Sequence, residues 1–244
     1  LKCPYCANSL LDRPQAFIAW PLLEKIVDDC AAAGYNIAAL HGTGEPMLWN
    51  RLEDVIRLIK RKGAGDGSFA TNGTLLTRKR AEKLLDAGLR NLRISLDSLD
   101  PQIYAATRGG KVQKVIRNIQ TLIDIAPDDF ITTVVLMRHK EQDIDNEQIS
   151  LFYRTFGVHE NVRLEIVENG LMVSAPEDYR AQPITVARCH RPREWFTITS
   201  QGIVSVCCSD QNALGVLGDL RFQTIDEIWY SDKTQQMLSN IALG

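Results

Sequence analysis

The sequence lacks several features that would assign it quickly to a familiar class of protein. Its 244 residues contain no apolar run that approaches the length of a membrane span. The formal net charge of −2 at pH 7 argues against a surface built for nucleic acid. No glycine-rich dinucleotide fingerprint follows any of the strands that the pattern predicts. Six cysteines are too few for a disulfide scaffold in a chain of this length.

The cysteines are grouped, and they are Cys3, Cys6, Cys30, Cys189, Cys207 and Cys208. Thiolates are the usual ligands of iron–sulfur clusters and of structural zinc, so the first and last groups are candidate metal sites. A Cys-x-x-Cys pair alone also fits half of a zinc knuckle or a dithiol redox pair. Cys30 lies on the apolar face of a predicted helix, and we expect it in the core. Clustered ligand thiols suit the reducing cytosol, which predicts a cytoplasmic protein.

Apolar periodicity alternates between helix and strand through the first two thirds of the chain. Strands are predicted at 36–41, 68–71, 92–96, 130–137 and 162–167. Helices are predicted between them, near 23–34, 52–59, 81–88, 112–123 and 149–156. Repeated βα units imply an α/β fold in which helices lie outside a parallel sheet.

The pattern changes near Met172. Residues 173–188 contain two prolines and no periodic apolar face, so they read as a linker. Residues 195–199 and 203–207 flank Ser200-Gln201-Gly202 and predict a β-hairpin, and residues 224–241 predict one helix. We therefore expect two domains, over residues 1–172 and 173–244.

Two motifs combine polar groups with predicted strand ends. Gly42-Thr43-Gly44-Glu45-Pro46 follows a predicted strand at the end where parallel sheets place their ligands. Glycines let backbone approach a ligand, and the Glu45 carboxylate could hold a cationic amine, although a simple turn is the other interpretation. In the strand near 93–97, Arg93, Ser95 and Asp97 share one face. Such a face suits either a bound polar ligand or solvent.

The cysteine pair and these motifs resemble the radical S-adenosylmethionine (SAM) enzymes. Cys3, Tyr5 and Cys6 match the second half of that family's Cys-x3-Cys-x2-Cys signature. The first cysteine would fall two places before Leu1, so we expect the chain to begin inside its own active site. The resemblance implies a partial (β/α)6 TIM-like barrel, with most of its first strand before Leu1. It also implies that Cys3 and Cys6 help to hold a 4Fe-4S cluster to which SAM binds.

The same resemblance implies roles for the residues around SAM. The segment 42–46 stands where the family has its Gly-Gly-Glu motif, so Gly44 and Glu45 would hold the methionine amino group, with Thr43 in place of a glycine. Ser95 would contact the SAM ribose or carboxylate, and Arg108 would pair with the carboxylate through parallel hydrogen bonds. Tyr5 would lie beside the adenine, although packing at the barrel mouth explains it equally well.

The later cysteines resemble the opening of SPASM and twitch auxiliary-cluster domains. Cys189, Gly202 and Cys207 follow the spacing Cys-x12-Gly-x4-Cys. The resemblance implies that Cys189 and Cys207 hold one or more auxiliary 4Fe-4S clusters, with further ligands beyond the end of the chain. Cys208 is expected to point away, because neighbours on a strand face opposite sides.

The resemblance implies an oxidoreductase that cleaves SAM reductively to a 5′-deoxyadenosyl radical and removes a substrate hydrogen. We expect a sugar or aminocyclitol substrate from natural-product biosynthesis, with Arg163 and Glu165 as candidate contacts. A flavodoxin or ferredoxin is the expected electron donor, and no nucleic acid or membrane partner is expected. The alternatives are a peptide-modifying maturase and a redox-neutral sugar epimerase or decarboxylase. A zinc-binding interaction module is disfavoured because the four histidines are scattered.

Overall fold

A computed structural model describes residues 11–138, 144–168, 191–208 and 212–243, together with residues 1, 3, 4, 6, 8 and 210. Its first part holds a parallel sheet in the order β1-β2-β3-β4. The strands are β1 (Phe69–Thr71), β2 (Asn91–Asp97), β3 (Ile131–Arg138) and β4 (Val162–Glu168). The helices of this part are α1 (Trp20–Ala33), the short 3-10 helix η2 (Pro46–Leu48), α2 (Leu52–Lys62), α3 (Arg78–Asp86), α4 (Pro101–Arg108), α5 (Val112–Ile125) and α6 (Asn146–Phe156).

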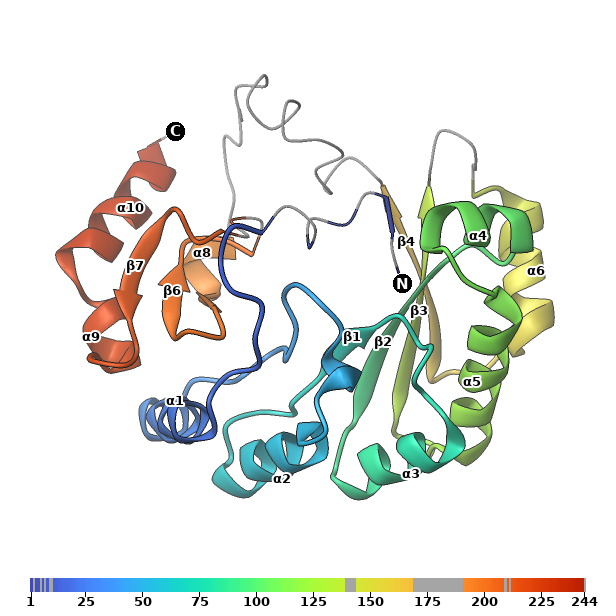
Figure 1. The fold of residues 1–244 in the computed structure, drawn as a ribbon, viewed down its shortest axis with the longest axis horizontal. Coiled ribbons are helices and arrows are strands. Elements are labelled where there is room, and N and C mark those ends of the chain that lie inside the picture. Colours follow the sequence, from blue (N-terminus) through green and yellow to red (C-terminus); the bar gives the residue numbers. More distant parts are fainter. Residues whose placement is uncertain are drawn as a thin grey trace.

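The two faces of the sheet differ in chemistry. The side chains on one face join the apolar core beneath the helices, and they include Leu92, Ile94, Leu96, Val134, Leu136, Leu164 and Ile166. Figure 1 shows α3, α5 and α6 along this side, whereas the chain's first residues lie toward the other. Because successive side chains alternate, Arg93, Ser95 and Glu165 point to the opposite face, which we call the inner face. The predicted α/β class and the parallel sheet are confirmed.

The strand predicted at 36–41 is wrong. This segment is extended, and the Ile37 and Leu40 amides donate to the Ala64 and Ser68 carbonyls, at 2.7 Å each. It joins no ladder, because its neighbour bends at Gly65, which has a φ of +122°. A Cβ there would stand 2.9 Å from the Ile37 carbonyl oxygen, so only glycine allows this approach.

Helix α4 was not predicted, although its signals are present. The Asp100 carboxylate accepts hydrogen bonds from the amides of Gln102 and Ile103, which caps the helix at its first turn. Pro101 occupies the first helical position, and Gly109 ends the helix with a left-handed φ of 70°. This helix places Arg108 and Tyr104 beside the carboxyl end of β2.

The C-terminal part forms a small antiparallel sheet with helices beside it. Its elements are α8 (Arg191–Glu194), β5 (Thr197–Ile198), β6 (Ile203–Ser205), β7 (Val216–Asp219), α9 (Ile225–Trp229) and α10 (Asp232–Leu243). The β5–β6 pair confirms the predicted hairpin. The single helix predicted at 224–241 is wrong, because the chain breaks between α9 and α10. There the Ser231 hydroxyl accepts the Thr234 amide at 3.3 Å and donates to the Ile228 carbonyl at 2.8 Å.

The C-terminal part packs on α1 through a shared core. This core contains Leu23, Ile26, Val27 and Cys30 of α1 together with Val204, Leu217, Leu220, Ile225 and Ile228. Lys25 also donates a hydrogen bond to the Gln223 carbonyl at 2.8 Å. The predicted core position of Cys30 is confirmed, and burial raises the pKa of its thiol to about 11. The predicted linker at 173–188 and the boundary after residue 172 lie outside the described residues.

No helix within the described ranges combines the length and apolar character that a membrane span requires.

The shared core gives a prediction about stability. Ile228 is fully buried, so Ile228→Ala should lower the free energy of unfolding by about 2–5 kcal/mol. Phe222 lies nearby in the chain but is 81% exposed, so Phe222→Ala should change it by less than about 0.5 kcal/mol. Urea unfolding of the two variants measures the difference. Equal effects would contradict a core that joins the two parts.

Candidate active site at the carboxyl end of the sheet

The Glu45 carboxylate is held firmly at the end of β1. One oxygen, Oε1, accepts the Thr71 hydroxyl at 2.7 Å and the Met47 amide at 3.1 Å. The other, Oε2, accepts the Asn72 amide at 2.9 Å. Gly44, just before it, has a φ of 91°, which favours glycine at this turn. The charge is therefore oriented before any ligand arrives, and its predicted bond to an amine stays a prediction.

Thr43, the departure from the Gly-Gly-Glu motif, makes a contact of its own. The Arg13 guanidinium donates to its hydroxyl at 2.9 Å. This bond ties residues near the start of the chain to the loop that carries Glu45. Sequence reasoning missed Arg13, because no local signal links two positions thirty residues apart.

A buried ion pair closes the carboxyl end of β2. Arg108 donates through Nε and Nη2 to the two carboxylate oxygens of Asp97, at 2.6 Å each. Asp97 is fully buried and adopts a φ of 65°, which is rare for a residue with a side chain. One edge of the Arg108 guanidinium is thus bound by Asp97. Ser95, half-buried on the inner face, lies two residues earlier. The predicted contacts of Ser95 and Arg108 with SAM stay predictions.

Cys3 and Cys6 lie together near this ion pair. The Cys6 amide donates to the Cys3 carbonyl at 3.1 Å, and both residues are half-buried. Burial raises the pKa of the Cys3 thiol; Arg108 lowers it, while Cys6 and Asp97 raise it further. These electrostatic interactions connect the first residues of the chain with the end of β2 and α4. Tyr5 lies outside the described residues.

A buried hydroxyl beside these cysteines fits an additional bound group. Tyr104 of α4 is fully buried, and its hydroxyl has no hydrogen-bond partner among the described residues. A Cβ on Gly110 would lie 3.1 Å from Leu1 Cδ2 and 3.5 Å from Tyr104 Cε1, so the ring edge adjoins the first residue. Unsatisfied buried hydroxyls are uncommon and point to a missing partner. Neighbouring thiols and a spare donor suit an iron–sulfur cluster, whose sulfurs accept hydrogen bonds.

The second cysteine group follows β6 in the C-terminal part. Cys207 is half-buried, whereas Cys208 is exposed and accepts a hydrogen bond from Arg191 at 3.6 Å. The loop after them is fixed by Asp210, which accepts the Ser205 hydroxyl at 2.7 Å and two backbone amides. Burial alone would raise the pKa of Asp210, but these hydrogen bonds hold it below its usual value. Cys189 lies outside the described residues, so its meeting with Cys207 stays a prediction.

The inner face carries a second ion pair. Arg93 of β2 donates to both oxygens of Glu165 on β4, at 2.8 and 2.6 Å. Arg163 is exposed on the same face of β4, as the alternation of that strand predicts. His41 adjoins this group, because its Nδ1 accepts the Ala70 amide at 3.0 Å. Sequence reasoning did not single out His41, although it directly precedes the motif at 42–46.

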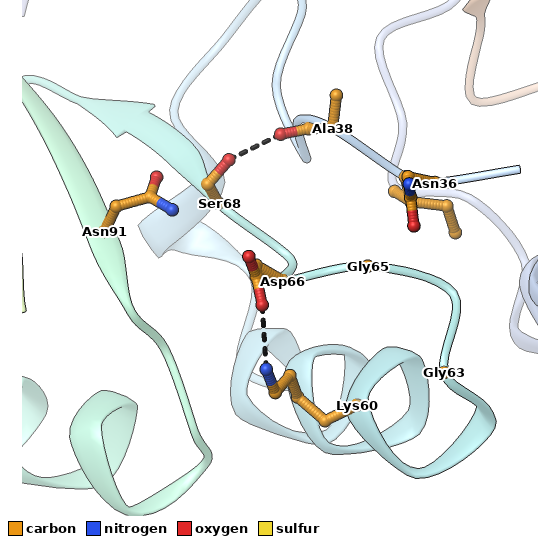
Figure 2. A pocket seen from close by; sticks show the side chains of 9 residues that line it. Asn36, Ala38, Lys60, Gly63, Gly65, Asp66, Ser68 and Asn91 are labelled. Carbon is orange, nitrogen blue, oxygen red and sulfur yellow. Dashed lines mark hydrogen bonds and ion pairs between the residues drawn. The ribbon is translucent and has the colours of Figure 1, made fainter.

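A cavity of about 460 Å³ lies at the opposite end of the sheet, where β2 begins. Asn36, Ser68 and Asn91 line it, together with Lys60 and Asp66, which form an ion pair of 2.8 Å (Figure 2). Parallel sheets bind their ligands at the carboxyl ends of the strands. The cysteines, Glu45 and the Asp97–Arg108 pair are at that other end, so we place the candidate active site there.

The buried ion pair gives the second prediction. Arg108→Ala leaves the Asp97 carboxylate buried without its cation, so it should lower the free energy of unfolding by about 3–5 kcal/mol. Arg90→Ala is the control, because Arg90 and Asp129 form an exposed pair at 3.7 Å. It should change stability by less than about 0.5 kcal/mol. Urea unfolding measures both, and a mild Arg108→Ala effect would show that Asp97 does not depend on Arg108.

Solved structures share the fold. The structure of anSMEcpe with bound AdoMet matches 97% of this chain and 78% of its own, with a TM-score of 0.73 and 16% identity. BtrN in complex with AdoMet and 2-DOIA matches 99% of this chain and 81% of its own, with a TM-score of 0.63 and 18% identity. SuiB from Streptococcus suis, bound to S-adenosylmethionine, matches 98% and 64%, with a TM-score of 0.70 and 13% identity. At these identities the likeness shows the fold alone.

Curated relatives match about half of the chain. A probable GTP 3',8-cyclase of Methanococcus aeolicus is 44% identical over 128 residues, which cover 51% of this chain and 42% of that protein. A GTP 3',8-cyclase of Limosilactobacillus fermentum is 35% identical over 148 residues, which cover 59% and 44%. The chain therefore spans less than half the length of these relatives.

Two family models match the chain in the expected order. Residues 1–150 match the radical SAM superfamily, and residues 189–242 match SPASM, an iron–sulfur cluster-binding domain. The first match covers more than half of the chain. The radical SAM match implies a 4Fe-4S cluster and SAM as cofactors, and the SPASM match implies auxiliary iron–sulfur clusters. The chain belongs to the radical SAM superfamily and carries a C-terminal SPASM domain.

Proposed function

We propose that this protein is a radical SAM oxidoreductase that oxidises a small polar molecule, such as a sugar or an aminocyclitol. The observation that carries the proposal is the joining of the two parts. The C-terminal part, which matches a cluster-binding domain, shares a core with α1 of the SAM-binding part. Such packing suits an enzyme in which two iron–sulfur centres act on one substrate.

The chain's residues position the cofactors. Cys3 and Cys6 are proposed to hold the SAM-binding cluster, and Cys189 and Cys207 the auxiliary one. When bound, the cluster and SAM supply a 5′-deoxyadenosyl radical that takes a hydrogen atom from the substrate, and an auxiliary cluster supplies an acceptor for an electron. Glu45 needs no rearrangement to bind an amine, because Thr71 and Asn72 already orient it.

The balance of the reaction gives the C-terminal part its proposed role. A secondary alcohol that becomes a ketone gives up one hydrogen atom, one proton and one electron. The SAM-derived radical would take the hydrogen atom, solvent would take the proton, and the electron would need an acceptor. Protein-bound iron–sulfur centres span roughly −700 to +450 mV, so one can be tuned for this task. A ferredoxin or flavodoxin is proposed to supply the first electron.

The proposed small substrate draws on the structural neighbours. BtrN was solved with 2-DOIA, and this chain covers 81% of it. anSMEcpe was solved with the Kp18Cys peptide, and this chain covers 78% of it, with a TM-score of 0.72. The structural neighbours thus include both kinds of ligand, and a peptide is the alternative substrate class.

The curated relatives support a second candidate, cyclisation of GTP. Their identity of 35–44% is well above that of the structural neighbours, but it is confined to about half of the chain. A triphosphate requires several cations close together. On the inner face, Glu165 already neutralises Arg93. We therefore place GTP second, and incubation of the reconstituted protein with GTP tests this candidate directly.

The third prediction concerns the auxiliary cluster. In Cys189→Ala/Cys207→Ala, iron per chain should fall, 5′-deoxyadenosine should still form, and oxidised product should disappear. Cys30→Ala is the control, because Cys30 is buried in the core and should not bind iron. Iron analysis and chromatography of the anaerobically reconstituted protein measure these outcomes.

Two results would contradict this role. Unchanged iron in the double variant would show that Cys189 and Cys207 hold no cluster. Reduced iron with full product formation would show that Cys189 and Cys207 hold a cluster, but that this cluster does not accept the electron from the substrate.

A further inference from the structure

We propose that Arg93, Glu165 and His41 form the substrate subsite, and that this subsite selects a neutral or cationic molecule with adjacent hydroxyl or amino groups. The inference rests on the proposed function in one respect, that the ligand of the inner face is the substrate. It does not depend on the role proposed for the auxiliary cluster.

The Arg93–Glu165 pair is oriented by two hydrogen bonds but remains accessible to a ligand. Its two hydrogen bonds, of 2.8 and 2.6 Å, span from β2 to β4 across β3. The side chains nevertheless keep 39% and 42% of their surface exposed, whereas Asp97 is fully buried. An exposed pair contributes at most about 1 kcal/mol to folding, so stability is a weak reason for it. A pair that is oriented and open suits recognition of a ligand.

His41 adds a donor with a defined direction. Its Nδ1 accepts the Ala70 amide at 3.0 Å, so Nδ1 carries no proton and the neutral ring is protonated at Nε2. Loss of surrounding water, and then the positive charge of Arg93, lower the pKa of His41. The ring therefore offers a neutral N–H group beside Arg93.

The subsite adjoins the groups assigned to SAM. Arg93 lies two residues before Ser95 on the same face of β2. Ala70, which holds His41, pairs in register with Arg93 and lies two residues before Asn72, which holds Glu45. Two residues of a strand span about 6.6 Å. A molecule on the subsite would thus lie next to bound SAM, as removal of a hydrogen atom requires.

The available hydrogen-bonding positions specify the ligand. Each Glu165 oxygen accepts one N–H from Arg93 and keeps room for a second donor. His41 supplies a donor for an oxygen of the same ligand. Adjacent hydroxyl or amino groups on a ring satisfy both demands. The three residues carry no net charge, and Arg163 nearby adds a single positive one, so a polyphosphate is poorly matched.

The test uses the anaerobically reconstituted protein with SAM and two probes, scyllo-inosamine and GTP. Isothermal titration should show that wild type binds scyllo-inosamine in preference to GTP. Glu165→Gln and Arg93→Gln should weaken scyllo-inosamine binding by about tenfold or more, because each removes a charged partner. Arg90→Gln is the matched control, an exposed arginine just before β2 whose partner is Asp129. It should bind as wild type does.

Formation of 5′-deoxyadenosine without any probe separates this inference from the proposed function. Its absence in wild type would defeat the proposed function itself. The subsite is overturned if the variants bind scyllo-inosamine as well as wild type does, or if wild type prefers GTP or binds neither probe. If the variants lose both SAM cleavage and probe binding, Arg93 and Glu165 are assigned to SAM binding, which also overturns the proposed subsite. Retained SAM cleavage with lost probe binding supports it.

Discussion

The site depends first on the buried ion pair between Asp97 and Arg108. Its two 2.6 Å bonds lock the end of β2 to the last residue of α4 and hold Asp97 in a left-handed conformation. Fixing α4 in turn fixes Tyr104, which lies beside Gly110 on the side where Leu1 also lies. The Cys3 thiol is close enough to this pair for Arg108 and Asp97 to affect its pKa. A buried pair of this kind is costly to break from one side, which makes it a rigid base for a cofactor.

A second constraint is the division of the sheet into two faces. The outer face is apolar and packs under helices, whereas the inner face carries Arg93, Ser95 and Glu165. Glu45 reaches the same end of the sheet from a separate loop and is oriented by groups of β1. Polar groups held in this way bind a ligand with little reorganisation, because the fold has already ordered them. The C-terminal part is kept in place by α1, so both predicted cluster regions belong to one packed structure.

The sequence predicted features that depend on neighbouring residues. The shared face of Arg93 and Ser95, the hairpin around Ser200 and the core position of Cys30 were recovered, because period and turn chemistry are local. The prediction that Asp97 shares this face is wrong, because the register shifts between Ser95 and Asp97, and Asp97 is buried. Features that depend on distant partners were not. The Asp97–Arg108 pair requires α4, which was not predicted, and the strand expected at 36–41 failed because Gly65 bends its neighbour. The helix expected at 224–241 is broken near Ser231, whose hydroxyl accepts a hydrogen bond from the Thr234 amide. Apolar periodicity does not reveal such a side-chain hydrogen bond to the backbone.

We propose that Cys3 and Cys6 hold a cluster to which SAM binds at the carboxyl end of the sheet. Electron paramagnetic resonance of the reconstituted, dithionite-reduced protein, with and without SAM, tests this assignment. SAM should change one component of the iron–sulfur signal, and this component should be missing from Cys3→Ala/Cys6→Ala. A signal that ignores SAM, or that survives unchanged in the double variant, would contradict it.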